Sequence, residues 1–165
     1  HPRFNQVLLD DSGAVVDIAS QPRPGRLAFT GIHLVEPSLL DWIPQQGFAD
    51  IVRSYRRMIA SGETIAGYVV HDHYWRDIGT IESYLEANRE LSPSPVLVGP
   101  GSEAADSACI SDWAVLGAGC RVEAGVSLSR SVLWEGVRIG EGVRVFDSVV
   151  TSGRTVVRDL CGEVL

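Results

Sequence analysis

Residues 71–91 (HDHYWRDIGTIESYLEANREL) place Trp75, Arg76 and Asp77 between an apolar run and a stretch with helical spacing. The junction between a strand and a helix is where α/β proteins often place ligand-binding and catalytic side chains. A carboxylate at this junction could hold a divalent cation, or it could accept hydrogen bonds from the first N–H groups of the helix. The residue types leave both roles open for Asp77.

Other side chains could also bind a ligand, but a structural or solvent-exposed role is the more common one for each. His71 and His73 share one face of an extended segment, but a third zinc ligand is not evident. His33 could reach a sugar, although a hydrogen-bonded structural histidine is the more common case. Four arginines could form a phosphate-facing patch or the solvated side of a helix: Arg53, Arg56, Arg57 and Arg76.

The elements expected to position these residues are of mixed α and β type in residues 1–91. NQVLLDDSGAVVDI predicts a hairpin, and RLAFTGIHLV and TIAGYVV predict strands. EPSLLDWI predicts a short helix with Pro37 in its first turn. Apolar residues with helical spacing predict a helix in GFADIVRSYRRMIASGE, ended by Gly62, and another in IESYLEANREL with Thr80 as its N-cap.

After a proline-rich linker at 92–97, the period of the sequence changes to six. Hexads such as ISDWAV, LGAGCR and VEAGVS begin with an aliphatic residue, and the pattern resumes after a one-residue slip. A short internal repeat of this kind predicts a parallel β-solenoid over residues 98–165, of about three coils at three hexads per coil. Trp113 and Trp134 would anchor an interface if they face outward.

Composition limits the partners. The chain has 165 residues, with 14 Lys and Arg against 21 Asp and Glu, which gives a formal net charge of −7. We expect neither nucleic acid nor an anionic membrane as a partner, because either would need a basic face. Three cysteines without metal-ligand spacing and the lack of a signal peptide or membrane segment predict a protein of the reducing cytoplasm.

The phrases FTGIHLVEPSLL, YWRDIGTIESYLEANREL and the hexads together resemble the sugar-nucleotide pyrophosphorylases, and within them the mannose-1-phosphate guanylyltransferase-like branch. The resemblance implies an α/β fold, with part of a Rossmann-like nucleotidyltransferase domain (1–91) followed by a left-handed parallel β-helix (98–165). It implies a reaction of a nucleoside triphosphate with a sugar 1-phosphate, giving an NDP-sugar, possibly GDP-mannose, and pyrophosphate.

The resemblance also implies roles for individual residues. Asp77 would be a Mg²⁺ ligand, and the backbone of Phe29, Thr30 and Gly31 would approach the sugar. Several family features are absent: the Gly-rich loop that binds the triphosphate, the first metal-binding Asp, and the Glu-Lys-Pro of the sugar-phosphate site, where VVDIASQPRPG stands. Because the chain also begins without Met, we expect it to be part of a longer protein and inactive alone.

Two other functions remain open. A regulatory or assembly subunit would use the solenoid for contacts, and nothing in the sequence excludes it. A hexapeptide acyltransferase is disfavoured because residues 98–165 contain no histidine to act as a general base. Whether the protein is a nucleotidyltransferase or a regulatory subunit, the unprotected ends of a solenoid predict a homo-oligomer, a dimer or larger.

Overall fold

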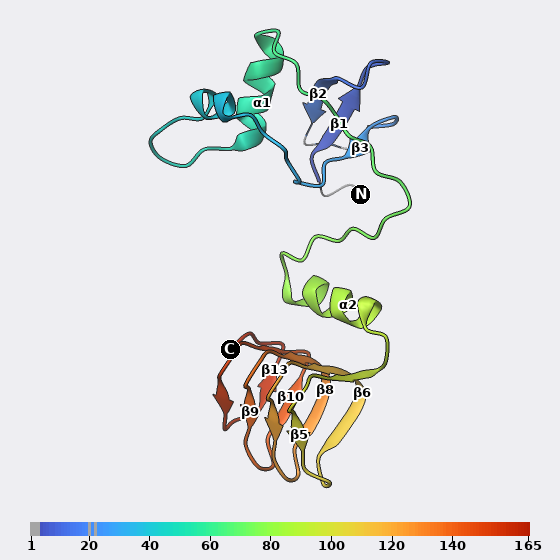
Figure 1. Ribbon diagram of the computed structural model, residues 1–165, viewed down its shortest axis with the longest axis vertical. Helices are drawn as coiled ribbons and strands as arrows, with labels where there is room; N and C mark the ends of the chain where they lie inside the picture. Colours follow the sequence, from blue (N-terminus) through green and yellow to red (C-terminus); the bar gives the residue numbers. More distant parts are fainter. Residues whose placement is uncertain (1–3, 20, 22) are drawn as a thin grey trace. The chain divides into compact units, whose positions relative to one another are not determined.

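The computed structural model describes residues 4–19, 21 and 23–165, and the chain divides into two compact units between Trp75 and Arg76 (Figure 1). The division falls earlier than the predicted linker at 92–97, so residues 76–91 lie in the same unit as the solenoid. No helix among the described residues has the length and apolar content needed to cross a bilayer.

The first unit is built on an antiparallel sheet with the order β2-β1-β3. Its strands are β1 (Gln6–Leu9), β2 (Val15–Ala19) and β3 (Leu27–Ala28). The predicted hairpin is confirmed, because Val7 pairs with Ile18 in an antiparallel register. The Asp10 side chain orders the turn by accepting hydrogen bonds from the N–H groups of Ser12 (2.9 Å) and Ala14 (3.0 Å).

Two helices complete this unit: η1 (Pro37–Trp42), a 3₁₀ helix, and α1 (Ile51–Ala60). The Asp50 carboxylate caps α1 by accepting a hydrogen bond from the Val52 N–H at 2.9 Å. The buried residues of the α1 face, Val52 and Tyr55, pack in one cluster with Ile18 of the sheet and Leu39 of η1. Both predicted helices are therefore confirmed.

The two strands predicted after the hairpin are largely wrong. RLAFTGIHLV pairs with β1 only at Leu27 and Ala28, and TIAGYVV makes only an isolated bridge between Ala66 and Ala14. Apolar side chains in both segments are exposed, including Leu34 and Tyr68. The segments have the composition of strands, but strands form only where a neighbouring backbone supplies hydrogen bonds, and none of the described strands does so here.

The second unit confirms the predicted parallel β-solenoid, with about four turns rather than about three. Each coil contributes strands to parallel sheets, ordered β13-β10-β8-β6-β4 and β12-β9-β7-β5, with β11 paired to β8. The strands are β4 (Val96–Val98), β5 (Glu103–Ala104), β6 (Cys109–Leu116), β7 (Arg121–Val122), β8 (Ser127–Leu133), β9 (Arg138–Ile139), β10 (Arg144–Phe146), β11 (Val149–Val150), β12 (Thr155–Val156) and β13 (Leu160–Cys161).

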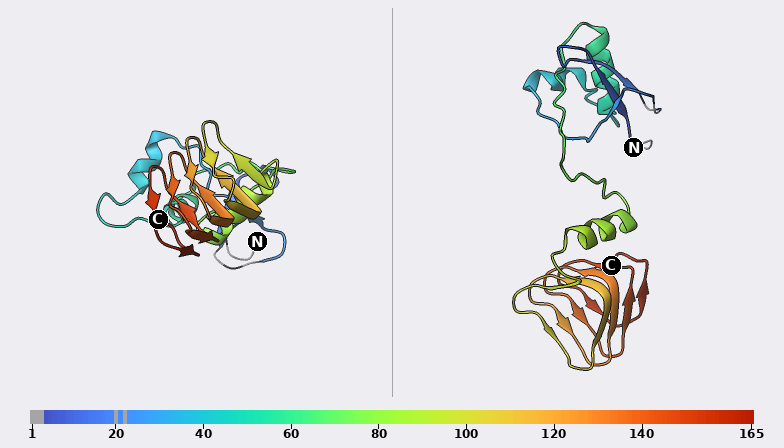
Figure 2. Two further views of the ribbon diagram at one scale, coloured as in Figure 1. Left: turned by 90° about the horizontal axis from the view of Figure 1, so that it is seen from below. Right: turned by 90° about the vertical axis from the view of Figure 1, so that its right-hand side faces the viewer.

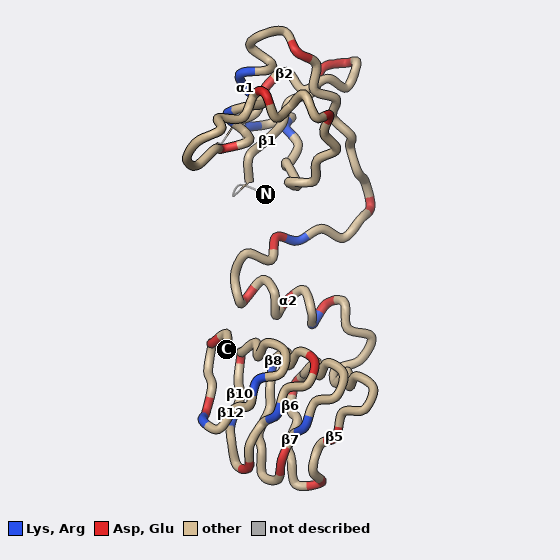
Figure 3. The backbone as a smooth tube through the Cα atoms, turned by 60° about the vertical axis from the view of Figure 1, so that its left-hand side comes forward, with Lys and Arg blue, Asp and Glu red and all other residues tan. Residues whose placement is uncertain are grey.

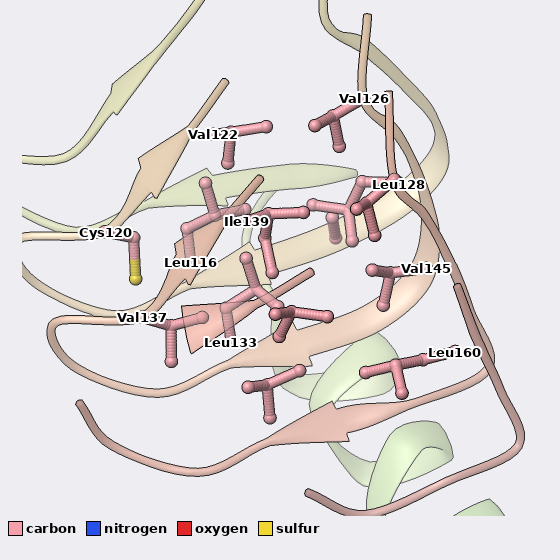
Figure 4. Close-up of a cluster of buried hydrophobic side chains, with 14 residues drawn as sticks. Leu116, Cys120, Val122, Val126, Leu128, Leu133, Val137, Ile139, Val145 and Leu160 are labelled. Atoms are coloured by element: carbon pink, nitrogen blue, oxygen red, sulfur yellow. The ribbon is translucent and has the colours of Figure 1, made fainter. Parts of the chain in front are cut away.

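The one-residue slip seen in the sequence is a change of coil length. Cys109 pairs with Ser127, a step of 18 residues, whereas Ser127 pairs with Arg144, a step of 17. From Ile110 onward, the aliphatic residues that open the hexads point into the coil and stack on their equivalents in the next turn (Figure 4). The labelled members of this core are Leu116, Cys120, Val122, Val126, Leu128, Leu133, Val137, Ile139, Val145 and Leu160. Their near-complete burial accounts for the regularity of the repeat.

Charged residues are distributed along the coils (Figure 3), and one corner carries a ladder of charges at successive turns. Arg130 donates hydrogen bonds to both carboxylate oxygens of Asp147, at 2.6 and 2.8 Å, and lies 3.4 Å from the Asp112 carboxylate. The hydrogen bonds and charge of Arg130 hold the pKa of Asp147 below its usual value. The ladder joins three successive turns at a corner where the backbone φ angles are positive.

The remaining helix, α2 (Ile81–Leu91), lies along the outside of β6 and β8, and the right-hand view of Figure 2 shows it beside the solenoid. Leu85 of this helix is buried with Trp113, Val132 and Val149 of the solenoid. The second unit is therefore a solenoid with one helix docked on its outer face.

Candidate functional site

Asp77 lies in a short ordered turn immediately before α2. Its Oδ1 accepts a hydrogen bond from the Gly79 N–H at 3.2 Å, and its side chain is exposed. Thr80, as predicted, is the N-cap of the helix: its hydroxyl accepts a hydrogen bond from the Ser83 N–H, and the Ser83 hydroxyl accepts one from the Thr80 N–H, each at 3.2 Å. Capping of α2 is thus carried out by Thr80, which leaves the Asp77 carboxylate as a turn residue accessible to a ligand.

The turn is tied to the side of α2 by Arg76. Its guanidinium forms ion pairs with Glu86 and with Glu90, the second at 2.7 Å. These glutamates lie four residues apart on one face of the helix, so one guanidinium can contact both. Arg76 therefore orients residues 76 and 77 on α2 through these two ion pairs.

The donor set suits one contact to a magnesium ion. Mg²⁺ takes hard oxygen ligands, keeps several waters and is usually held by one or two carboxylates together with substrate phosphates. Asp77 offers one exposed carboxylate and forms no ion pair within the described residues. Among those residues no cluster of three or more His, Cys, Asp or Glu side chains could enclose a metal by itself. Asp77 therefore fits a shared metal site completed by ligands other than these residues.

The predicted sugar-binding segment, Phe29 to Gly31, folds around His33. The Phe29 ring meets the His33 ring edge-on with centroids 5.0 Å apart, and His33 Nδ1 shares a hydrogen bond of 2.6 Å with Tyr55 Oη. Burial raises the pKa of the Tyr55 phenol, so this group stays neutral and can donate. His33 is therefore a hydrogen-bonded structural residue that anchors the segment to α1.

Gly31 adopts a φ of +80°, and a Cβ there would meet no heavy atom within 4 Å. The glycine is required by the backbone conformation, and its surface is open to solvent. Thr30 is also exposed, and its hydroxyl accepts a weak hydrogen bond of 3.4 Å from the Ile32 N–H. This short turn presents exposed backbone groups, as a sugar-binding segment would need.

The predicted site residues belong to different compact units. Phe29, Thr30 and Gly31 lie in the first unit and Asp77 in the second, and each group is described within its own unit. Among the other candidates, His71 and His73 are exposed, Arg56 donates to the Ile18 carbonyl at 2.9 Å, and Arg57 lies over the Trp42 ring at 5.9 Å. Part of the segment VVDIASQPRPG, namely Ser20 and Pro22, lies outside the described residues.

Both solenoid tryptophans face outward and contact α2 of the same chain, which buries Trp113 but leaves Trp134 38% exposed. Trp113 is buried against Leu85, and the Trp134 indole N–H donates to the Tyr84 hydroxyl at 3.0 Å. The outward alternative is confirmed, and the contact seen among the described residues is with α2; anchoring of another chain stays a prediction. A signal was present in the outward valines that recur at Val115, Val132 and Val149, since an exposed solenoid face is normally polar.

Comparison with known proteins agrees with the resemblance. Residues 2–94 match the nucleotidyl transferase family model. Similar proteins include mannose-1-phosphate guanylyltransferase of Mycobacterium tuberculosis, 32% identical over 126 residues, which cover 68% of this chain and 35% of that protein. Mannose-1-phosphate guanylyltransferase 1 of Arabidopsis thaliana is 28% identical, over 93% of this chain and 48% of the relative. Glucose-1-phosphate thymidylyltransferase of Streptomyces antibioticus is 25% identical, over 88% and 55%.

The chain therefore belongs to the nucleotidyl transferase family. The predicted fold class is confirmed as a fragment of a nucleotidyltransferase domain followed by a parallel β-solenoid. The chain spans roughly a third to a half of the length of these relatives.

Proposed function

We propose that this chain is the C-terminal part of a sugar-1-phosphate nucleotidyltransferase, with GDP-mannose among its candidate products. The names of the relatives and the family match support this class. The observation that carries the proposal is the exposed Asp77 carboxylate, held in an ordered turn within the residues that match the family.

In the proposed reaction, a phosphate oxygen of the sugar 1-phosphate attacks the α-phosphorus of the nucleoside triphosphate. A new P–O bond forms while the bond to pyrophosphate breaks, so the main requirements are in-line positioning and neutralisation of phosphate charge. Bound Mg²⁺ would supply that neutralisation. Asp77 contributes one oxygen ligand, held by its turn, and the backbone around Thr30 and Gly31 contacts the sugar.

We assign assembly to the solenoid. Its first strand, β4, lies at the edge of its sheet and exposes Val96, Leu97 and Val98. An apolar strand with an unpaired edge can pair with a second chain, so we propose a homo-oligomer formed at this end. The net charge of −7 disfavours nucleic acid and anionic membranes, and the three free thiols suit the reducing cytoplasm.

The proposal is tested by pyrophosphate release from the intact protein that contains this chain, with Mg²⁺ and a panel of sugar 1-phosphates and nucleoside triphosphates. We expect Asp77→Asn to lower kcat/KM about a hundredfold, because a carboxamide is a much weaker ligand for the cation. Asp72→Asn is the matched control: Asp72 is exposed, and asparagine tolerates its φ of +59°.

Equal activity of wild type and Asp77→Asn would show that Asp77 is only a turn residue. If the folded wild-type protein releases no pyrophosphate from any substrate pair, the protein is instead a regulatory or assembly subunit. This second function is favoured by the same exposed edge of β4.

A further inference from the structure

The outer face of the solenoid under α2 is specialised for contact with a helix. Val115, Val132 and Val149 occupy equivalent outward positions in successive turns, because Val115 pairs with Val132 and Val132 with Val149. All three belong to the cluster that contains Leu85 of α2. The stripe of valines thus forms a continuous apolar surface along which the helix lies.

An irregularity in the coil adds Trp113 to this surface. The register between β6 and β8 shifts between Ser111 and Ala114, which inserts one extra residue into the longer coil. Trp113 lies in the insertion and is only 7% exposed, packed with Leu85. Bulges of this kind often redirect a side chain. Here the redirected indole enlarges the apolar surface on which α2 packs.

The helix is also held by a directed contact. Tyr84 and Leu85 are neighbours on α2: Leu85 enters the apolar cluster, and the Tyr84 hydroxyl accepts the Trp134 indole N–H at 3.0 Å. Apolar burial drives docking, and the hydrogen bond restricts rotation of the helix on the face.

The residues before α2 are in turn attached to the helix. Arg76 is paired with Glu86 and Glu90, Thr80 caps the first turn, and Gly79 donates to Asp77. Contacts therefore run without a break from the solenoid, through α2, to the Asp77 carboxylate.

We propose that docking of α2 on the solenoid positions the Asp77 carboxylate, with Leu85 and Trp113 as positioning residues; this inference rests on the proposed nucleotidyltransferase function. A displacement of about 1 Å in a reacting group can cost about a hundredfold in rate. The solenoid thereby acts on the metal site as well as on assembly.

The test uses Leu85→Ala and a matched control, Leu91→Ala, which makes the same change at a 65% exposed position of the same helix. Amide hydrogen exchange of this chain is measured at Gly79 and Ser83 and, for comparison, in β8. We expect exchange at Gly79 and Ser83 to rise at least tenfold in Leu85→Ala only, while β8 is unchanged. Leu85→Met, which conserves volume, should restore slow exchange.

The second measurement is the Mg²⁺ dependence of pyrophosphate release by the intact protein. Mispositioning of Asp77 predicts a midpoint at least tenfold higher in Leu85→Ala, with much of kcat recovered at saturating Mg²⁺. A loss of folded protein would instead lower the amplitude at an unchanged midpoint. Leu91→Ala and Leu85→Met should match the wild type in both respects.

Faster exchange with an unchanged Mg²⁺ midpoint would overturn the proposal, since docking would then be structural only. Unchanged exchange would overturn it as well. If the wild type releases no pyrophosphate, the proposed function fails. The rate of amide exchange at Gly79 in Leu85→Ala then tests by itself whether docking of α2 orders the Asp77 turn. Should Leu85→Ala not fold, Tyr84→Phe removes only the acceptor of Trp134; several-fold faster exchange at Gly79 supports the proposal, and no change overturns it.

Discussion

Substitution of Gly117 is predicted to destabilise the solenoid, because the backbone of the next coil lies too close to admit a Cβ atom. A Cβ at this position would lie 2.7 Å from the Glu135 nitrogen and 2.8 Å from the Trp134 carbonyl carbon, both of them backbone atoms of the next turn. Ordinary contact begins near 3.4 Å, so the two turns would have to separate by roughly 0.7 Å. The change tested is Gly117→Ala.

The cost can be worked out from the contacts. The Gly117 N–H donates to the Leu133 carbonyl at 2.7 Å, and separation of the turns would stretch this bond and weaken its neighbours. Overpacking costs about 1–3 kcal/mol and a weakened hydrogen bond about 1 kcal/mol, offset by about 0.4–1 kcal/mol from the stiffer unfolded chain. We expect Gly117→Ala to lower the free energy of unfolding of the solenoid by about 2–3 kcal/mol.

Gly119, two residues along, provides a control with a different mechanism. Its φ is +67°, and a Cβ there would meet nothing within 4 Å. Gly119→Ala should cost about 1–2 kcal/mol, from the left-handed conformation alone, and Gly119→Asn should largely remove that cost. Gly117→Asn should be at least as harmful as Gly117→Ala.

The assay is native-state amide exchange in β8, which reports the opening of the solenoid separately from the first unit. A Gly117→Ala protein as stable as the wild type would refute the reasoning from coil spacing. A greater loss in Gly119→Ala than in Gly117→Ala would show that backbone conformation, rather than contact, determines the choice of glycine.

Two further predictions concern charge and assembly. The pKa of Asp147 is lowered by Arg130, so its contribution to stability is fully present above the pKa of an unfolded Asp, about 4, and is lost as the pH falls through the lower folded value. Urea unfolding should give a constant stability of the solenoid from pH 7 to about 5 and a decline below about 4; Asp147→Asn should flatten that decline, and an unchanged slope would contradict the role of the ladder. Sedimentation should show an oligomer that Leu97→Lys dissociates and Val157→Lys, at another exposed position, does not; a wild-type monomer at micromolar concentration would refute assembly through β4.

The solenoid could be predicted because its evidence is repeated within the chain. Leu116 and Leu133 lie 17 residues apart, and each satisfies the same requirement for an inward aliphatic residue. The hairpin and the Thr80 cap were also predictable, since a turn or cap depends on residues close in sequence. Local rules and repeats therefore determine most of what the sequence reveals.

The strands predicted at TIAGYVV and in most of RLAFTGIHLV are absent from the described residues because a strand depends on a partner distant in sequence. Val69 and Val70 have high strand propensity, yet a strand also needs a backbone beside it, and the propensity of a segment does not show whether one is available. The packing partner of Trp113 could not be predicted for a similar reason. Its outward direction depends on the bulge between Ser111 and Ala114, and its contact with Leu85 depends on how two separate elements dock.

The family match and the compact units divide the chain at different places. The match extends to residue 94, whereas the second compact unit begins at Arg76, so residues 76–94 belong to both. Asp77 lies in this shared segment, where its carboxylate accepts a hydrogen bond from the Gly79 N–H and the adjacent Arg76 pairs with Glu86 of α2. Because α2 packs on Trp113 and the outward valines, the proposed coupling between the solenoid and the carboxylate involves residues of the second unit. Under the proposed function, the segment RDIGT therefore belongs both to the nucleotidyltransferase match and to the unit that contains the solenoid.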